Sequence, residues 1–173
     1  SAPHGVIVGP DGAPWITDSG QNAIVRVDPK TRAVRVWPLG GDVGYANLNT
    51  LTFDRKGRVW FTGQSGYYGR LVPETSDMKV WKAPGGRGPY GIATTPGGDV
   101  YYASLAGNHI ARIDTESGVA TVIANPFFAS FTTTESRNSP PALSPAIILP
   151  EKTFAWSRCS VTNSRIDARS NAA

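Results

Sequence analysis

A sequence unit of about 42 residues occurs three times in succession, and this repeat constrains the fold more than any other feature. The first half of the unit recurs as PHGVIVGPDGAPWIT (3–17), LNTLTFDRKGRVWFT (48–62) and PYGIATTPGGDVYYA (89–103). The second half recurs as NAIVRVDPKTRAVRVW (22–37), GYYGRLVPETSDMKVW (66–81) and NHIARIDTESGVATV (108–122). A fixed period of this length indicates a repeat architecture, in which each unit packs against the next. We therefore expect a functional site to lie where units meet.

Within each unit the apolar side chains recur with a period near two, which is typical of β-strands. In the first unit the turn Gly9-Pro10-Asp11-Gly12 follows the first such segment, and each of these residue types suits a turn for a backbone reason. Further strands are predicted at 14–17, 23–28 and 33–37, at 59–62, 68–72 and 78–81, and at 100–103, 110–114 and 119–123. Four short strands in a unit of this length are typical of a β-propeller blade. The sequence therefore predicts an all-β fold with three four-stranded blades, at about 3–39, 46–84 and 88–124.

Two kinds of residue recur at fixed positions in the three units. A large ring lies three residues after the turn glycine, and such a column packs most simply between neighbouring sheets. The rings of this column are Trp15, Trp60 and Tyr101. The second column consists of Arg26, Arg70 and Arg112. We expect these arginines to form salt bridges from blade to blade or hydrogen bonds with the backbone.

The repeat stops after residue 125. All 19 glycines lie in residues 1–125, whereas residues 126–173 are rich in Ser, Thr, Asn and Pro and contain no glycine. This composition predicts an irregular, weakly ordered tail. The tail is either a natural capping segment or a replaced or misread sequence where a fourth blade should begin. The predicted domains are therefore 1–125 and 126–173.

Three blades form an incomplete ring, because known closed propellers have at least about four. An open stack of blades leaves two blade faces exposed, and exposed edges of a β-sheet can pair with another chain. We therefore expect the chain to self-associate through its exposed blade edges, to cover them with the tail, or to be part of a longer protein.

Composition argues against several classes of partner and site. The formal net charge is +4 and the basic residues are spread out, so we expect no nucleic-acid partner. No apolar run approaches about 18 residues, so we expect no membrane span. The single cysteine, Cys159, excludes an intrachain disulfide and a cysteine-based metal site. The chain begins without Met, which fits a processed leader or a fragment, and both a cytoplasmic and a periplasmic location in a bacterium fit the sequence.

A column of polar and aromatic residues lies at the start of the first strand of each unit. In a propeller this strand lines the central channel, so we expect the three side chains to face one cavity at one mouth. The column consists of His4, Asn49 and Tyr90. Further candidates for ligand contact lie on loops near the same mouth, and these are Tyr45, Asn47, Gln64, Tyr67, Arg87 and Ser104.

The chemistry of four side chains, His4 among them, bears on whether they are functional or structural. His4 suits the role of a base or metal ligand because the pKa of histidine lies near neutrality, and a solvated or capping histidine also fits. Asp18 is either a functional carboxylate or the cap of a turn. We interpret His109 as a surface residue and Cys159, which has no histidine motif nearby, as unreactive.

The three units resemble blades of virginiamycin B lyase and its bacterial homologues over about residues 2–124. The shared pattern is Pro-aromatic/His-Gly-Ile, a glycine turn, Trp-Phe-Thr and Asn-x-Ile-x-Arg. It is carried by PHGVIVGPDGAPWITDSGQNAIVRVDP (3–29), GRVWFTGQSGYYGRL (57–71) and GPYGIATTPGGDVYYASLAGNHIARID (88–114). The resemblance implies a seven-bladed propeller that linearises type B streptogramins, which are cyclic depsipeptides. In that reaction a base removes a proton alpha to a carbonyl and the C–O bond of the ester breaks without water, with a Mg²⁺ ion nearby.

The resemblance also implies roles for particular residues. In the family, histidines of two Pro-His motifs supply the base and help to position the metal, together with glutamates. The Pro-His-Gly segment around His4 matches one motif and makes His4 the expected base, with Ala2 in place of the acid that precedes the motif in the catalytic blade. Asp18 lies close to where the family has an acid and is the expected Mg²⁺ ligand. The second motif is missing, and the matching positions hold Asn49 and Tyr90.

Three functions therefore stand as hypotheses. The first is an incomplete or inactive streptogramin lyase. The second is a non-catalytic propeller that binds a small ligand or a protein through the loops of one face. The third is a metal-dependent lactone hydrolase on a related propeller, for which Asp18 is the one well-placed acidic ligand.

Overall fold

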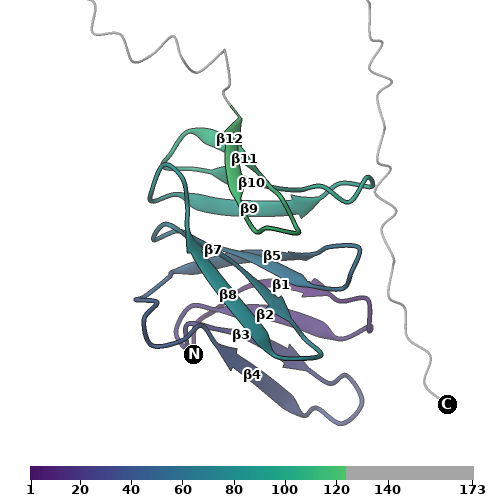
Figure 1. The fold of residues 1–173 in the computed structure, drawn as a ribbon. Helices are drawn as coiled ribbons and strands as arrows, with labels where there is room; N and C mark the ends of the chain where they lie inside the picture. The colour runs from purple at the N-terminus through teal and green to yellow at the C-terminus, as the bar shows by residue number, and fades with distance from the viewer. Residues whose placement is uncertain (124–173) are drawn as a thin grey trace, which may run out of the picture. The chain divides into compact units, whose positions relative to one another are not determined.

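The structure is a computed structural model, and it describes residues 1–123. These residues form three four-stranded sheets (Figure 1). The first sheet contains β1 (Pro3–Val8), β2 (Pro14–Asp18), β3 (Ala23–Val27) and β4 (Val34–Pro38). The second contains β5 (Leu48–Phe53), β6 (Val59–Gly63), β7 (Tyr67–Val72) and β8 (Asp77–Lys82). The third contains β9 (Pro89–Thr94), β10 (Val100–Ser104), β11 (His109–Ile113) and β12 (Ala120–Ile123). The predicted tail and the boundary at residue 125 lie outside the described residues.

Each sheet is an antiparallel meander, in which every strand pairs with the next one along the chain. The first strands, β1, β5 and β9, lie side by side, and the three sheets do not close into a ring (Figure 1). This arrangement confirms the predicted all-β fold of three four-stranded propeller blades. In the described part of the chain, no helix is long and apolar enough to cross a membrane.

The recurring glycine closes the turn between the first two strands of each blade. Gly12, Gly57 and Gly98 have φ angles of 73°, 74° and 95°. These values lie in the left-handed region, where a side chain is unfavourable. The repeat therefore keeps glycine at this position for a backbone reason.

The structure corrects the interpretation of His109 as a surface residue. His109 begins β11, its side chain is partly buried, and its Nδ1 bonds to the Gly107 carbonyl at 2.9 Å. A Cβ atom added to Gly85 or Gly107 would lie within 2.7 Å of the imidazole. The sequence could not reveal this burial, because it depends on two glycine-containing loops that approach the ring from different segments.

The hydrophobic core lies between the blades and contains two of the three rings of the predicted column. Trp15 is almost fully buried and its ring lies edge-on to Phe53 of the second blade, with centroids 5.4 Å apart. Trp60 is fully buried in a second cluster that includes Tyr102 of the third blade. Tyr101, which has no following blade among the described residues, is only partly buried. The packing of the two tryptophans between sheets confirms the prediction made from the repeat.

The arginine column forms salt bridges within each blade, so the prediction of blade-to-blade pairs is wrong. The pairs are Arg26–Asp11 at 2.6 Å, Arg70–Asp77 at 2.8 Å and Arg112–Asp99 at 2.7 Å. Each arginine lies opposite the recurring ring on the neighbouring strand, and an acid of its own sheet is within reach: Asp11 and Asp99 in turns and Asp77 at the start of β8. The pairs that do cross between blades involve Glu116, which contacts Lys56 at 2.7 Å and Arg58 at 3.2 Å.

A buried carboxylate ties the β5–β6 turn to the core. Asp54 accepts hydrogen bonds from Arg58 Nε at 2.6 Å and from Trp60 Nε1 at 2.8 Å. It also accepts the backbone N–H groups of Lys56 and Arg58. Asp54 and Arg58 are both largely shielded from solvent. Because a buried charge is stabilised only when it is paired, this turn depends on the complete set of bonds.

We expect Asp54→Ala to lower the free energy of unfolding by about 3 kcal/mol, because it leaves the shielded Arg58 Nε and the buried indole N–H without an acceptor, while Glu116 still pairs with the far end of the guanidinium. Denaturant titration followed by tryptophan fluorescence measures the loss. Asp99→Ala is the matched control, since it removes an exposed ion pair with Arg112 and should change stability little. An equal effect of the two substitutions would contradict the importance of burial.

Candidate functional site

Every first strand is irregular at the position of the predicted channel column. In the first blade, His4 and Gly5 together lie opposite the single residue Thr17. The corresponding sets are Asn49 and Thr50 opposite Thr62, and Tyr90 and Gly91 opposite Ala103. Two residues opposite one form a β-bulge, which interrupts the ladder and turns a side chain and a carbonyl in new directions. The candidate site is therefore built on three equivalent bulges.

Threonine hydroxyls connect the bulge of one blade to the bulge of the next. Thr17 Oγ1 donates to the Asn49 carbonyl at 2.6 Å and accepts the N–H of Gly5 at 2.9 Å. One blade further on, Thr62 donates its hydroxyl to the Tyr90 carbonyl. Both threonines are fully buried. The three bulges are thus held in fixed relation by hydrogen bonds inside the stack of blades.

His4 lies at the exposed side of this arrangement. Its Nδ1 is 3.1 Å from the Asn49 carbonyl oxygen. Because a carbonyl oxygen only accepts, the hydrogen of this bond belongs to Nδ1, and the neutral ring carries its lone pair on Nε2. The ring lies edge-on to Tyr90, with centroids 6.1 Å apart. The structure therefore brings His4 and Tyr90 together, from the first and third blades.

Asn49 contributes to the site differently from its two neighbours in the column. Its side chain is only 2% exposed and its Nδ2 donates to the Asn47 carbonyl at 3.2 Å. Tyr90, in contrast, is 37% exposed. The open side chains of the column are thus His4 and Tyr90, while Asn49 offers its backbone carbonyl.

Three of the loop candidates form one chain of hydrogen bonds. The Tyr45 hydroxyl bonds to Asn47 Oδ1 at 3.3 Å, and Asn47 Nδ2 donates to Gln64 Oε1 at 3.2 Å. Tyr45 remains 62% exposed. The structure therefore unites Tyr45, Asn47 and Gln64 into a polar group on the connections between strands.

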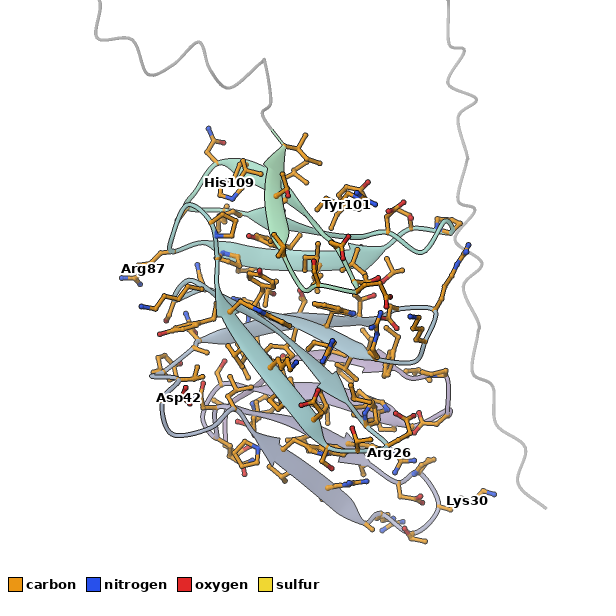
Figure 2. The ribbon with its side chains drawn as sticks, in the orientation of Figure 1. Arg26, Lys30, Asp42, Arg87, Tyr101 and His109 are labelled. Carbon is orange, nitrogen blue, oxygen red and sulfur yellow. The ribbon has the colours of Figure 1, made fainter. Side chains whose placement is uncertain are left out.

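The other loop candidates lie in different surroundings. Arg87 is exposed on the connection between β8 and β9, on the same side of the blades as Asp42 on the connection between β4 and β5 (Figure 2). Tyr67 packs against the first core cluster. Ser104 is buried, and its hydroxyl has no hydrogen-bond partner within the described residues. Ser104 and Tyr90 line a hollow of about 390 Å³ on the third blade.

Asp18 is buried and fully hydrogen-bonded. One carboxylate oxygen accepts the backbone N–H groups of Ala2 at 2.8 Å and Gln21 at 3.0 Å, and the other accepts Ser1 Oγ at 2.5 Å and Gln21 Nε2 at 2.8 Å. Burial alone would raise the pKa of this carboxyl, but the hydrogen bonds outweigh burial and hold the pKa well below its usual range. Asp18 therefore fastens the first residues of the chain to the turn after β2.

The described residues do not fit a Mg²⁺ site. Mg²⁺ requires oxygen ligands in near-ideal octahedral geometry, whereas both oxygens of Asp18 already accept N–H and O–H donors. Residues 1–123 contain no group of three His, Cys, Asp or Glu side chains that could hold a metal ion. The role of Asp18 as a metal ligand stays a prediction, and it would require the four donors to leave.

Sequence reasoning missed the bulges and the two threonines. A signal was present, since Thr17 and Thr62 occupy the same place in the repeated Trp-x-Thr segments, whereas the third unit has Ala103 there. The repeat marks the position, but the hydroxyl's partner is a carbonyl in another blade. That partner is visible only in the fold.

Stacked four-stranded meanders with their first strands side by side define the chain as a β-propeller protein. A model of the virginiamycin B lyase family matches residues 1–137. The chain therefore belongs to the virginiamycin B lyase family.

Solved structures of lyases are similar to this chain. Virginiamycin B lyase from Staphylococcus aureus is 29% identical with a TM-score of 0.64, over 72% of this chain and 42% of that enzyme. A catalytically inactive variant of that enzyme with quinupristin matches equally well. A streptogramin B lyase structure is 25% identical with a TM-score of 0.64, over 73% of this chain and 41% of that one.

A relative with another activity also matches. The gluconolactonase of Zymomonas mobilis subsp. mobilis is 41% identical over 78 residues, which cover 44% of this chain and 21% of that protein. The chain thus spans less than half the length of the relatives that it matches. Propellers related to this chain carry different activities, so family membership alone does not assign a reaction.

We expect Asp18→Asn to lower the thermal midpoint at pH 7, because the amide cannot accept all four donors. The pKa of Asp18 is depressed in the folded state, so its contribution is complete above the ordinary pKa of about 4 and is lost as pH falls through the lower folded value. The difference in thermal midpoint between the parent chain and Asp18→Asn should therefore persist down to about pH 4 and shrink in stronger acid. Thermal unfolding followed by circular dichroism across this range tests it.

Asp42→Asn is the control for this series, because Asp42 is exposed on the connection before β5. A loss of thermal midpoint in Asp18→Asn that grows as the pH falls would contradict the role of the ionised carboxylate as a hydrogen-bond acceptor.

Proposed function

We propose that this chain supplies part of an active site for C–O elimination in a cyclic depsipeptide of the type B streptogramin class, with His4 as the base. The observation that carries the proposal is the arrangement of His4, whose Nδ1 bonds to the Asn49 carbonyl while Nε2 keeps the lone pair. Membership of the virginiamycin B lyase family supports the substrate class.

In the proposed reaction, His4 Nε2 takes the proton alpha to a carbonyl of the substrate. The electron pair left on carbon forms a C=C bond, and the ester C–O bond breaks to release a carboxylate. A neutral imidazole suits this step because the lone pair on Nε2 can accept the proton. The product is linear and has the same mass as the cyclic substrate.

Ligand contact is proposed for Tyr90 and for three polar side chains on connections between strands. Tyr90 lies against the imidazole and offers an aromatic face and a hydroxyl. Tyr45, Gln64 and Arg87 lie on connections between strands, and the last two can donate hydrogen bonds to ester and amide oxygens. Donors of this kind stabilise the negative charge that develops on a carbonyl oxygen.

The remaining parts of the proposed site would come from outside the described residues, since this chain spans 42% of the similar lyase. Mg²⁺ is proposed on the family resemblance alone, and when bound it would supply positive charge near the developing negative charge. Because Asp18 is already saturated with donors, no step is assigned to it. We accordingly expect slow turnover by the 173-residue chain.

Lactone hydrolysis is the second candidate. The observation that favours it is the 41% identity to a gluconolactonase over 78 residues. Both reactions open a cyclic ester, but hydrolysis adds water and elimination does not. A propeller that only binds a small ligand or a protein is the third candidate.

Mass spectrometry separates these reactions. The purified chain is incubated with quinupristin or another type B streptogramin and Mg²⁺, and we expect a linear product of unchanged mass. His4→Ala should abolish the product, because it removes the base, whereas the exposed substitution Asp42→Asn should not. A product heavier by one water would support hydrolysis. An intact substrate would support binding without turnover, and turnover by His4→Ala equal to that of the parent chain would overturn the role of His4 as the base.

We also propose that the isolated chain self-associates through its outer blades. Val6 and Val8 on β1 are 65% and 73% exposed, and Leu105 after β10 is 67% exposed. These apolar side chains lie on blades that have a neighbour on one side only within the described residues. Sedimentation velocity should give a mass above that of one chain. The double substitution Val6→Thr and Val8→Thr should shift the equilibrium toward the monomer, and a monomeric parent chain would contradict the proposal.

A further inference from the structure

The Asn49 carbonyl is shared by two donors from the first blade. It lies 2.6 Å from Thr17 Oγ1 and 3.1 Å from His4 Nδ1. A carbonyl oxygen has two lone pairs and can accept both bonds at once. The position of this one atom therefore fixes the direction in which the His4 ring donates.

Of the two donors to the Asn49 carbonyl, Thr17 makes the shorter hydrogen bond. Its side chain is fully buried, and its oxygen accepts the Gly5 N–H at 2.9 Å. The hydroxyl has one hydrogen, and the Asn49 carbonyl at 2.6 Å is much closer than the Gly5 carbonyl at 3.5 Å. The hydrogen therefore points across the boundary between blades, and the Asn49 carbonyl is held from inside the stack.

Gly5 makes this close approach possible. A Cβ atom at Gly5 would collide with the Asn49 carbonyl oxygen and would lie 3.1 Å from Thr17 Oγ1. The bulge, the hydroxyl and the carbonyl thus occupy a space with no room for a side chain at Gly5. The arrangement leaves little freedom for the carbonyl, and hence for the imidazole that bonds to it.

We infer that Thr17 is a positioning residue for His4: its buried hydroxyl fixes the Asn49 carbonyl, and this carbonyl keeps the hydrogen on Nδ1 and the lone pair on Nε2. The catalytic meaning of this inference rests on the proposed function, whereas its structural content does not. A base must present a fixed lone pair to the proton that it removes, and loss of orientation costs up to about a hundredfold in rate.

The test uses Thr17→Val, which keeps the shape of the side chain and removes the hydroxyl, and Thr17→Ser, which keeps the hydroxyl. Thr94→Val is the control, because it removes another hydroxyl that donates across a blade boundary, to the Phe53 carbonyl at 2.8 Å, away from His4. Nitrogen-15 spectra of the imidazoles report the tautomer directly, and the chain contains only two histidines, so His109 serves as an internal reference.

We expect neutral His4 to be protonated at Nδ1 in the parent chain, in Thr17→Ser and in Thr94→Val. In Thr17→Val the two nitrogen shifts should move toward each other, as the two tautomers become mixed, and kcat should fall by about tenfold with a smaller change in KM. Thr17→Ser should restore the nitrogen shifts and kcat to the values of the parent chain.

Protonation of His4 at Nε2 in the parent chain would overturn the inference, and so would a Thr17→Val spectrum identical to that of the parent. If Thr17→Val does not fold, the nitrogen-15 spectra of the parent chain and of Thr17→Ser test the inference, since both must show His4 protonated at Nδ1. The spectra require no turnover. A parent chain without lyase activity but with the expected spectra would remove the proposed function and leave the positioning of His4 intact.

Discussion

Each blade of this protein is a sheet with two faces, and its apolar side chains are buried only where a neighbouring blade covers them. Trp15 is enclosed because the second blade supplies Phe53, and Trp60 is enclosed because the third blade supplies residues such as Tyr102. Val6 and Tyr101 lie on outer blades and remain partly or largely exposed. In a repeat protein of this kind stability comes mainly from the boundaries between units. The boundary is therefore the structural unit on which everything else depends.

The same boundaries build the candidate site. His4, Asn49 and Tyr90 come from three different blades, and none of them contacts the others unless the blades are stacked in register. The bulges in β5 and β9 each free a carbonyl from the ladder, and a threonine of the preceding blade binds it. Packing and site geometry are consequently coupled. A buried substitution between blades can change the direction of a ring that is exposed at the surface.

Two buried carboxylates of this protein serve the fold through their hydrogen bonds. Asp18 holds the first residues of the chain and the turn after β2, and Asp54 holds a turn and the indole of Trp60. Each is saturated with donors, so neither is free for a metal or a proton transfer in the observed arrangement. His4 and Tyr90 are the exposed side chains of the channel column, and of these two the His4 imidazole carries a ring nitrogen lone pair that can take a proton. This explains why the proposed chemistry centres on a histidine whose carbonyl partner comes from the next blade.

The amino-acid sequence alone predicts the repeat, the strands, the turn glycines at Gly12, Gly57 and Gly98, and the column that contains His4. These features are local or periodic, and a side-chain pattern with a period of two records them directly. It misjudged the partners of Arg26 and the burial of His109, because both depend on which segments approach from elsewhere in the chain. The bond from Thr17 to the Asn49 carbonyl, and the bond from His4 to the same carbonyl, become visible only in the folded chain. The physical reason is that these contacts join residues of different blades through backbone atoms, and every residue type has the same backbone carbonyl.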